Sequence, residues 1–306
     1  MNSLIEQATR RLEQLRQAGV ISKDVENVNL DDISTKKLKV ETSSSVETSK
    51  IIESTTKPLS YSRKVDLDLD ALAGAGIVSP NAPRSQIADQ YRVIKRPLIS
   101  NAMGKGASLI ENGNLIMVTS ALAGEGKSFS AINLAMSIAT ELDNTVMLVD
   151  ADVARPSVLR MLGLPASPGL LDLLVGDVED LSSVLLKTNI DKLTLLPSGT
   201  PHLRATELLA SEAMSQLIKN IANRYSDRII IFDSPPLLLT TESRVLATHM
   251  GQIVMVVHAE KTLQVDIQHA LSSIEACPVK MMVLNQAKNS LQGGYGGYGY
   301  GYGYEQ

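Results

Sequence analysis

From Ser85 onward, short and fully apolar runs alternate with amphipathic segments. Runs of strand length without polar alternation indicate strands that are buried on both faces, as in parallel sheets. The alternation favours an α/β fold, with a mostly parallel sheet and helices on both faces. The expected strands are 115–120, 145–149, 193–198, 228–233, 251–259 and 279–285, and the expected helices are 85–96, 127–142, 206–225 and 262–275.

A glycine-containing segment, ALAGEGKS at 121–128, follows the first strand and precedes a helix. Its spacing matches the phosphate-binding loop, although Ala121 replaces the usual first glycine. Backbone amides at the start of the helix can surround a phosphate, while Lys127 would contact its oxygens and Ser128 would reach Mg²⁺. The pattern predicts a P-loop NTPase that binds a nucleoside triphosphate with Mg²⁺; the alternative is a turn with a surface lysine. The predicted cofactor-binding residues here are Gly124, Glu125, Gly126, Lys127, Ser128 and Phe129.

Three aspartates directly follow apolar strands: Asp150 and Asp152 in TVMLVDAD, and Asp233 in RIIIFDSPP. Ligands bind at the carboxyl ends of strands in open parallel sheets, so all three should lie at the same rim as the P-loop. Carboxylates that meet repel each other unless a cation lies among them, and Mg²⁺ with a triphosphate supplies one. For each aspartate alone, the alternative is a helix N-cap.

The N-terminal part of the chain has a different composition. Residues 4–18 have helical apolar spacing and Gly19 supplies a stop signal, which predicts an amphipathic helix within a segment 1–20. This helix is either a surface helix or a docking helix. Residues 22–63 are rich in Ser, Thr, Lys and Glu, and we expect a largely disordered linker over 21–84, with one short helix within 67–83. The folded domain should then span 85–290.

The last sixteen residues, LQGGYGGYGYGYGYEQ, contain seven glycines and five tyrosines. No packed element tolerates that glycine density, so residues 291–306 are expected to form a flexible tail. Its tyrosines are Tyr295, Tyr298, Tyr300, Tyr302 and Tyr304.

Charge and cysteine usage narrow the function classes. The net charge is −4 and the sequence pI is about 5.7, so no basic field for nucleic acid is present. A single cysteine, Cys277, excludes a disulfide framework and is typical of a reducing compartment. No apolar run approaches the ~20 residues that span a bilayer, and the N-terminus lacks a signal-peptide core. We therefore expect a cytoplasmic protein without a membrane span.

Three motifs in this order resemble the bacterial tyrosine autokinases. They are TSALAGEGKS at 119–128, LVDADVARP at 148–156 and IIIFDSPP at 229–236, followed by a tyrosine-rich C-terminus. The resemblance covers roughly residues 85–306. SLIEQATRRLEQLRQAG and IADQYRVIKRPL are similar to the subgroup found in exopolysaccharide loci with PEP-CTERM/exosortase systems. The chain departs from the family in having Ala123 where proline is common, and Ala154 then Arg155 where the motif DxDxR has its arginine.

The resemblance implies an ATP-dependent, non-specific protein-tyrosine kinase that phosphorylates its own C-terminal tyrosines, in trans, and regulates exopolysaccharide polymerisation or export. Asp150 would accept or orient the proton of the tyrosine hydroxyl, and Lys127 would stabilise the transferred phosphoryl group. Ser128, Asp152 and Asp233 would hold Mg²⁺. The resemblance therefore gives Lys127, Asp150, Asp152 and Asp233 as catalytic residues and the five tail tyrosines as phosphoacceptors.

Further residues are interpreted through the same resemblance. Asn285 ends the last strand, where related P-loop ATPases bind the adenine edge; a strand-end cap is the alternative. Asp89, Arg92 and Lys95 stand where relatives carry ExxRxxR, which implies self-association into a ring-like oligomer. Implied partners are a transmembrane polysaccharide co-polymerase (chain-length determinant) that activates the kinase at the inner membrane, and a tyrosine phosphatase.

Two other functions compete with this one. The first is a partitioning-type P-loop ATPase, a binding switch without kinase activity. Such proteins usually carry a second lysine near the start of the loop, where this chain has Leu122. The second is a catalytically idle regulator whose glycine-tyrosine tail drives association. The intact Lys127 and the three aspartates argue against it.

Overall fold

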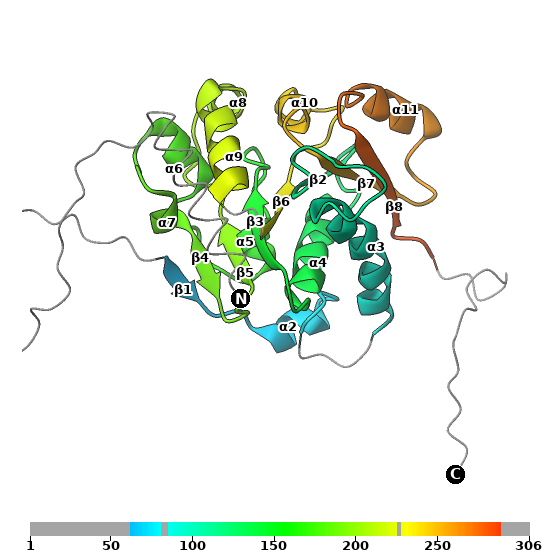
Figure 1. Cartoon of the computed structure of the whole chain (residues 1–306), viewed down its shortest axis with the longest axis horizontal. Coiled ribbons are helices and arrows are strands. Elements are labelled where there is room, and N and C mark those ends of the chain that lie inside the picture. The colour runs from blue at the N-terminus through cyan, green and yellow to red at the C-terminus, as the bar shows by residue number, and fades with distance from the viewer. Residues whose placement is uncertain (1–61, 81–84, 225–227, 289–306) are drawn as a thin grey trace, which may run out of the picture. The chain divides into compact units, whose positions relative to one another are not determined.

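The computed structural model describes residues 62–80, 85–224 and 228–288, and these form an eight-stranded sheet (Figure 1). The strand order is β1-β4-β5-β3-β6-β2-β7-β8. All neighbouring strands are parallel except β4 and β5, which are antiparallel. The strands are β1 (Arg63–Val65), β2 (Leu115–Ser120), β3 (Thr145–Asp150), β4 (Leu186–Thr188), β5 (Leu193–Leu196), β6 (Arg228–Asp233), β7 (Gln252–His258) and β8 (Val279–Asn285).

Helices cover both faces of the sheet, as the fully apolar strands predict. One face packs against α2 (Leu69–Gly74), α3 (Gln86–Ala102), α4 (Lys127–Ala139) and α5 (Val158–Met161). The other packs against α6 (Leu170–Val175), α7 (Leu181–Val184), α8 (Ala205–Leu209), α9 (Glu212–Arg224), α10 (Glu242–Ala247) and α11 (Gln264–Ser272). The predicted fold class, a P-loop NTPase fold with a mostly parallel sheet, is confirmed.

All six predicted strands are present, and β1 and β4 were missed because each has only three residues. The helix predicted over 206–225 is two helices, α8 and α9. Ser211 lies between them, where its hydroxyl accepts a hydrogen bond from the Met214 amide at 3.3 Å and so begins a new helix. The single-helix prediction was wrong because periodicity alone does not detect such a cap.

The predicted start of the folded domain, residue 85, is too late. Within the predicted linker, β1 pairs with β4, and α2 is the short helix expected within 67–83. Leu72 and Ile77 are buried against α4, and the Val78 amide donates to the Asn133 side chain of α4 at 2.7 Å. These few apolar residues and this hydrogen bond join the segment to the face of the sheet that α4 covers. Residues 1–61, including the predicted N-terminal helix, lie outside the described residues.

Helix α3 extends past the predicted end at residue 96 and contains Pro97. A proline inside a helix removes one backbone hydrogen bond, so a strong tertiary contact must hold the turn that follows. Leu98 is fully buried, its carbonyl accepts a hydrogen bond from the buried Gln252 side chain at 3.0 Å, and Asn101 donates to Gln252 at 2.9 Å. These buried contacts therefore keep α3 helical beyond Pro97.

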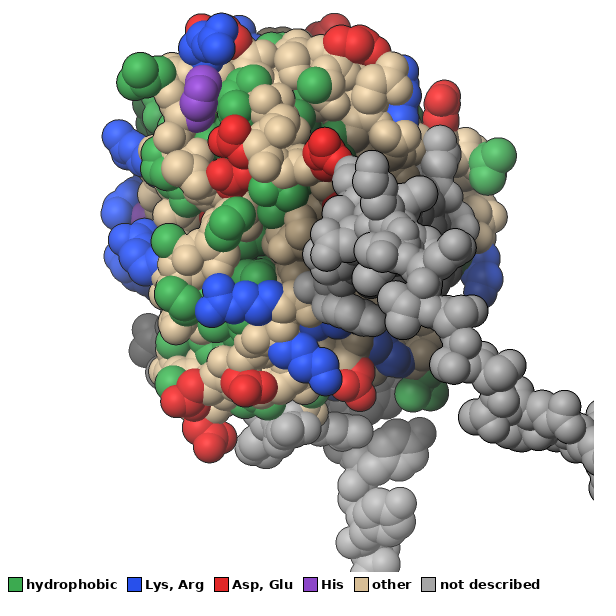
Figure 2. All heavy atoms as spheres, turned by 90° about the vertical axis from the view of Figure 1, so that its left-hand side faces the viewer, with side chains coloured by type: hydrophobic (Ala, Val, Ile, Leu, Met, Phe, Trp, Pro, Cys, Tyr) green, Lys and Arg blue, Asp and Glu red, His purple; other side chains and the backbone are tan. Residues whose placement is uncertain are grey.

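No helix of the described ranges is long and apolar enough to cross a membrane. On the described part of the face at the β1 end of the sheet, acidic and basic side chains are interspersed with apolar ones (Figure 2). That face therefore carries no field of a single sign.

Candidate functional site: the phosphate-binding loop

The P-loop joins β2 to α4 at the carboxyl edge of the sheet, as its sequence predicts. Gly124 has a φ of +84° and Gly126 a φ of +93°, a region that side chains rarely adopt. Gly126 is required for a second reason, because a Cβ atom there would collide with the Asn285 amide nitrogen. Helix α4 begins at Lys127, so its free amides lie where a phosphate binds in a P-loop.

Glu125 fixes the conformation of this loop. Its side chain is buried, and one carboxylate oxygen accepts the Leu122 amide at 2.7 Å while the other accepts the Thr262 hydroxyl. The Glu125 carbonyl also accepts a hydrogen bond from Asn285 at 2.9 Å, and Gln286 donates to the Gly124 carbonyl at 3.3 Å. The ends of β7 and β8 therefore hold the loop through three side chains.

The sequence did not single out Thr262 and Gln286. The available signal was their position, since each lies just beyond the carboxyl end of a predicted strand, on the same edge as the P-loop. Asn285 was expected at this edge and lies against the loop, where it hydrogen-bonds the loop backbone. The Phe129 side chain packs on the face of α4 that contacts the segment after α2, near Gly76.

Lys127 and Asp152 form an ion pair of 2.6 Å, and both side chains are largely buried. The Lys127 ammonium also lies 3.4 Å from the Ser128 hydroxyl. Lysine, hydroxyl and carboxylate thus meet at the first turn of α4. A lysine that is paired with a carboxylate can exchange that partner for phosphate oxygens when a nucleotide binds.

Asp150 and Asp233 end neighbouring strands and are paired in the β3–β6 register, as the sequence predicts for carboxylates at one rim. Asp150 accepts two backbone amides, Ser157 at 3.1 Å and Val158 at 3.0 Å, through the same oxygen. It therefore does anchor the start of α5, which was the alternative role considered for it. Its other oxygen has no hydrogen-bond partner among the described residues, and burial raises its pKa to about 6.

Asp233 is completely buried, and neither oxygen of its carboxylate has a hydrogen-bond partner among the described residues. Burial raises the pKa of Asp233 to about 7, against the attraction of the nearby Lys127 charge and with added repulsion from Asp150. A buried carboxylate without a partner is rare in folded proteins and marks a place that a ligand or ion completes.

The donor set suits Mg²⁺, a hard cation that prefers oxygen ligands. In the described ranges, no three His, Cys, Asp or Glu side chains are arranged to hold a metal ion by themselves. Mg²⁺ in nucleotide sites usually takes only one or two protein carboxylates, with phosphate and water completing its shell. The unbonded oxygens of Asp233 near Ser128 and Asp152 are consistent with that arrangement.

A cavity of about 340 Å³ opens beside Lys127 and Asp152. Its other walls include Ala154, Pro235, Pro236 and Leu239, which are apolar, and Arg155. The Thr119 hydroxyl donates to the Pro235 carbonyl at 2.9 Å and so holds the proline segment next to the loop. The cavity therefore has one charged end and an apolar side, which the sequence motifs alone did not indicate.

The three residues predicted for oligomerisation differ in position. Asp89 and Arg92 form an exposed ion pair of 2.5 Å on α3. Lys95 is buried, and its ammonium donates to the Ser137 carbonyl and the Thr140 hydroxyl and pairs with Glu141 at 2.7 Å. Its charge already joins α3 to α4 within one chain, and its assignment to an intersubunit contact stays a prediction. The predicted phosphoacceptors, Tyr295 to Tyr304, lie outside the described residues.

The fold and loop together define a P-loop nucleotide-binding protein, and the family model described as "AAA domain" matches residues 113–281, more than half of the chain. Tyrosine-protein kinase YwqD of Bacillus subtilis is 29% identical over 224 residues, 72% of this chain and 90% of that protein. Tyrosine-protein kinase CpsD of Streptococcus agalactiae is 30% identical over 61% of this chain and 82% of its own. The chain belongs to the AAA-domain family and, within it, to the bacterial tyrosine-protein kinases.

Other tyrosine-protein kinases are matched over only 24–27% of their own length, so this chain corresponds to one part of those larger proteins. Among solved structures, the chimerical protein CapA2B2 superposes with a TM-score of 0.55 and 26% identity, over 70% of this chain and 97% of that one.

Proposed function

We propose that this chain is an ATP-dependent protein-tyrosine kinase that phosphorylates its own C-terminal tyrosines, Tyr295, Tyr298, Tyr300, Tyr302 and Tyr304. The observation that carries the proposal is the cavity beside the Lys127–Asp152 pair. Its apolar walls, Pro235, Pro236 and Leu239, suit the ring of a tyrosine, and its charged end lies where the P-loop would present a terminal phosphate.

The proposed division of work follows from burial and hydrogen bonding. The amides at the start of α4 bind phosphate, and Lys127 leaves Asp152 to stabilise charge on the transferred group. Ser128 and Asp152 would hold Mg²⁺, with Asp233 completing its shell directly or through water; Mg²⁺ neutralises phosphate charge when bound. Asn285 would contact the adenine edge from the end of β8.

A tyrosine hydroxyl has a pKa near 10 and is a poor nucleophile at neutral pH. Asp150 is proposed to accept or orient its proton through the oxygen that does not anchor α5. A pKa of about 6 suits a base that works near neutral pH. Because Asp150 is only 1% exposed, this role requires access through the cavity side of the loop.

The remaining parts of the proposal concern assembly. Twenty residues after Gln286 span at most ~70 Å when extended, enough to reach a neighbouring subunit, so phosphorylation in trans is proposed. Asp89 and Arg92 remain candidates for a ring-like oligomer. A transmembrane polysaccharide co-polymerase would recruit the kinase to the inner membrane from the cytoplasm, and a tyrosine phosphatase would reset it.

We also propose that the kinase acts in exopolysaccharide synthesis and belongs to the PEP-CTERM/exosortase-associated subgroup. It would have no nucleic-acid partner. The domain limits proposed from the sequence for the two ends, 1–20 and 291–306, stand as proposals.

The test is phosphorylation of the purified full chain with Mg²⁺-ATP, with phosphotyrosine mapped by mass spectrometry. Phosphate on residues 295–304 that Lys127→Met abolishes is expected. Lys187→Met, which removes an exposed lysine of β4, is the matched control and should leave the signal unchanged. ATP hydrolysis without phosphotyrosine, even with the cytoplasmic segment of the membrane partner present, would favour the partitioning-type ATPase switch instead.

A further inference from the structure

Strand β8 forms one edge of the sheet, and among the described residues it pairs only with β7. Native proteins usually protect an edge of this kind with charges, a short strand or a covering element. Here the edge is seven residues long with a single charged residue, Lys280, and it exposes Met282 (59%) and Leu284 (65%). The edge therefore has the character of a surface that another strand covers.

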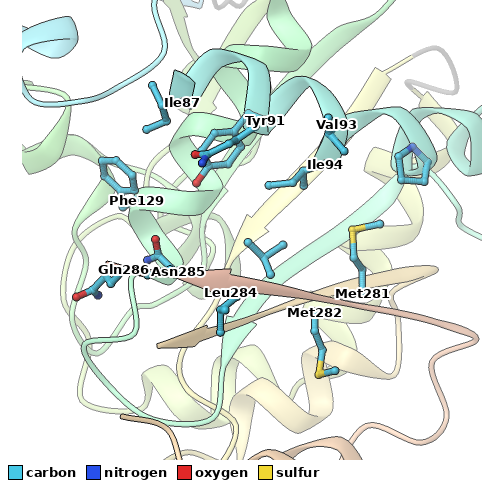
Figure 3. A pocket seen from close by; sticks show the side chains of 14 residues that line it. Ile87, Tyr91, Val93, Ile94, Phe129, Met281, Met282, Leu284, Asn285 and Gln286 are labelled. Atoms are coloured by element: carbon cyan, nitrogen blue, oxygen red, sulfur yellow. The ribbon is translucent and has the colours of Figure 1, made fainter. Parts of the chain in front are cut away.

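An apolar groove of about 680 Å³ runs between this edge and α3 (Figure 3). Ile87 and Ile94 of α3, Phe129 of α4, and Met281 and Leu284 of β8 line it. The groove ends at Asn285, Gln286 and Ala287, directly before the last described residue, Lys288.

We propose that this groove and the β8 edge are a docking site for the chain's own C-terminal segment 295–304, which adds to β8 as a further strand. The proposal goes beyond the proposed kinase function and does not rest on it. Strand addition satisfies the free row of backbone groups on the edge, while side chains of the added strand fill the adjacent groove.

Three features favour this segment as the occupant. It begins only a few residues beyond the end of the groove, so docking within one chain has a high effective concentration. Residues two apart share a face of a strand, so Tyr298, Tyr300, Tyr302 and Tyr304 would form one aromatic row, with glycines on the other face. Residues 289–304 contain no charged side chain, so docking buries no charge.

The main rival occupant is the amphipathic segment 4–18. It carries several charges, and the described chain begins beside β1, at the opposite edge of the sheet. Tyrosine also suits this groove better, because Met281, on the α3 side of β8, offers a sulfur–aromatic contact (Figure 3).

Docking would make the tail sensitive to modification. Each phosphate on a tyrosine adds a charge of about −1.5 to −2, which an apolar groove does not accommodate. The groove would hold the unmodified tail and release the phosphorylated one. Because Asn285 and Gln286 line the groove and also hold the P-loop backbone, tail docking and nucleotide binding would influence each other.

Hydrogen exchange measured by mass spectrometry tests the site directly. We compare the full chain with a chain that ends at Lys288, and expect exchange of the 279–285 amides to be about tenfold slower in the full chain. In the full chain, Leu284→Lys should remove this protection, whereas Leu142→Lys, at a more exposed leucine between α4 and β3, should leave it intact.

A second measurement keeps the proposal falsifiable if Leu284→Lys disturbs folding. A fluorescein-labelled peptide of residues 293–304 should bind the chain that ends at Lys288, and the same peptide with phosphotyrosines should bind at least about tenfold more weakly. Equal exchange in the two chains would overturn the proposal. Protection that is lost on deletion of residues 1–20, or that grows with protein concentration, would also overturn it, in favour of the N-terminal segment or a second copy.

Discussion

Two buried charged side chains, Lys95 and Asp233, lie near opposite ends of α4, and of these two only Lys95 has hydrogen-bond partners in the described residues. At its C-terminal end, the Lys95 ammonium has three partners, the Ser137 carbonyl, the Thr140 hydroxyl and Glu141. At its N-terminal end, Asp233 is equally buried and neither oxygen has a partner among the described residues. A satisfied charge joins elements of the fold, whereas an unsatisfied one marks the end that a ligand completes.

The largest expected effect follows from removing the Lys127 charge at the N-terminal end of α4. Lys127→Met removes the cation that would stabilise the transferred phosphoryl group, so tail phosphorylation should fall at least about 100-fold. Phosphotyrosine formation at saturating Mg²⁺-ATP measures it, with Lys187→Met as the control. A variant that kept more than a tenth of the activity would show that the P-loop lysine is not the group that stabilises transfer.

Lys95→Met removes the hydrogen-bonded ammonium at the C-terminal end of α4. The methionine fills a similar volume but leaves two oxygens and Glu141 without their donor; since Glu141 is 31% exposed, water compensates part of the loss. We expect a loss of about 2 kcal/mol, or roughly 4–8 °C in melting temperature. Nucleotide affinity should stay within twofold. An unchanged melting temperature would show that the ion pair adds nothing to the packing of α3 on α4.

Glu125 is a third buried charge, and both of its oxygens are bonded. Thr262→Val removes the hydroxyl that bonds one of them, so the P-loop should lose order and bind Mg²⁺-ADP about tenfold more weakly. Thr262→Ser keeps the hydroxyl and should restore affinity, as measured by isothermal titration calorimetry. Weak binding by both variants would mean that the threonine methyl group, and not the hydrogen bond, positions the loop.

The sequence predicts the residues at the N-terminal end of α4 much better than the contacts at its C-terminal end. The placement of Gly124, Lys127, Asp150 and Asp233 at one edge of the sheet could be predicted, because phosphate loops and strand-end carboxylates follow local spacing rules. The role of Lys95 could not, because its partners lie over 40 residues away and depend on how α3 crosses α4. The contribution of residues 63–79 was missed for the same reason.

Asp233→Asn tests the Asp233 carboxyl, which has no hydrogen-bond partner in the described residues, through the pH dependence of stability. The folded-state pKa is about 7 and the ordinary value is 3.8, so the folded state binds more protons between these values. Asp233 therefore makes stability fall as pH rises from about 4 to about 7, and the asparagine variant should lack this fall. At pH 8 we expect the variant to be about 1 kcal/mol more stable in urea titrations, with the difference vanishing near pH 4.

The control for this experiment is the gain in stability that Mg²⁺-ADP gives to the wild-type chain and to Asp233→Asn. If Asp233 belongs to the nucleotide site, Mg²⁺-ADP should stabilise the wild-type chain more than the variant. A stability difference that did not change with pH would contradict the raised pKa. An equal gain from Mg²⁺-ADP in both chains would remove Asp233 from the proposed metal set.

The smallest expected effect concerns the neighbour of Lys95 on the same helix. Arg92 pairs with Asp89 in the open, and an exposed pair contributes at most about 0.5 kcal/mol, so Arg92→Ala should leave the melting temperature almost unchanged. If the two side chains form an oligomer contact, light scattering should show a smaller assembly for Arg92→Ala. A smaller assembly at unchanged stability would place self-association on the exposed turn of α3. A large loss of stability would instead show that α3 needs Arg92 as well as Lys95 in order to pack.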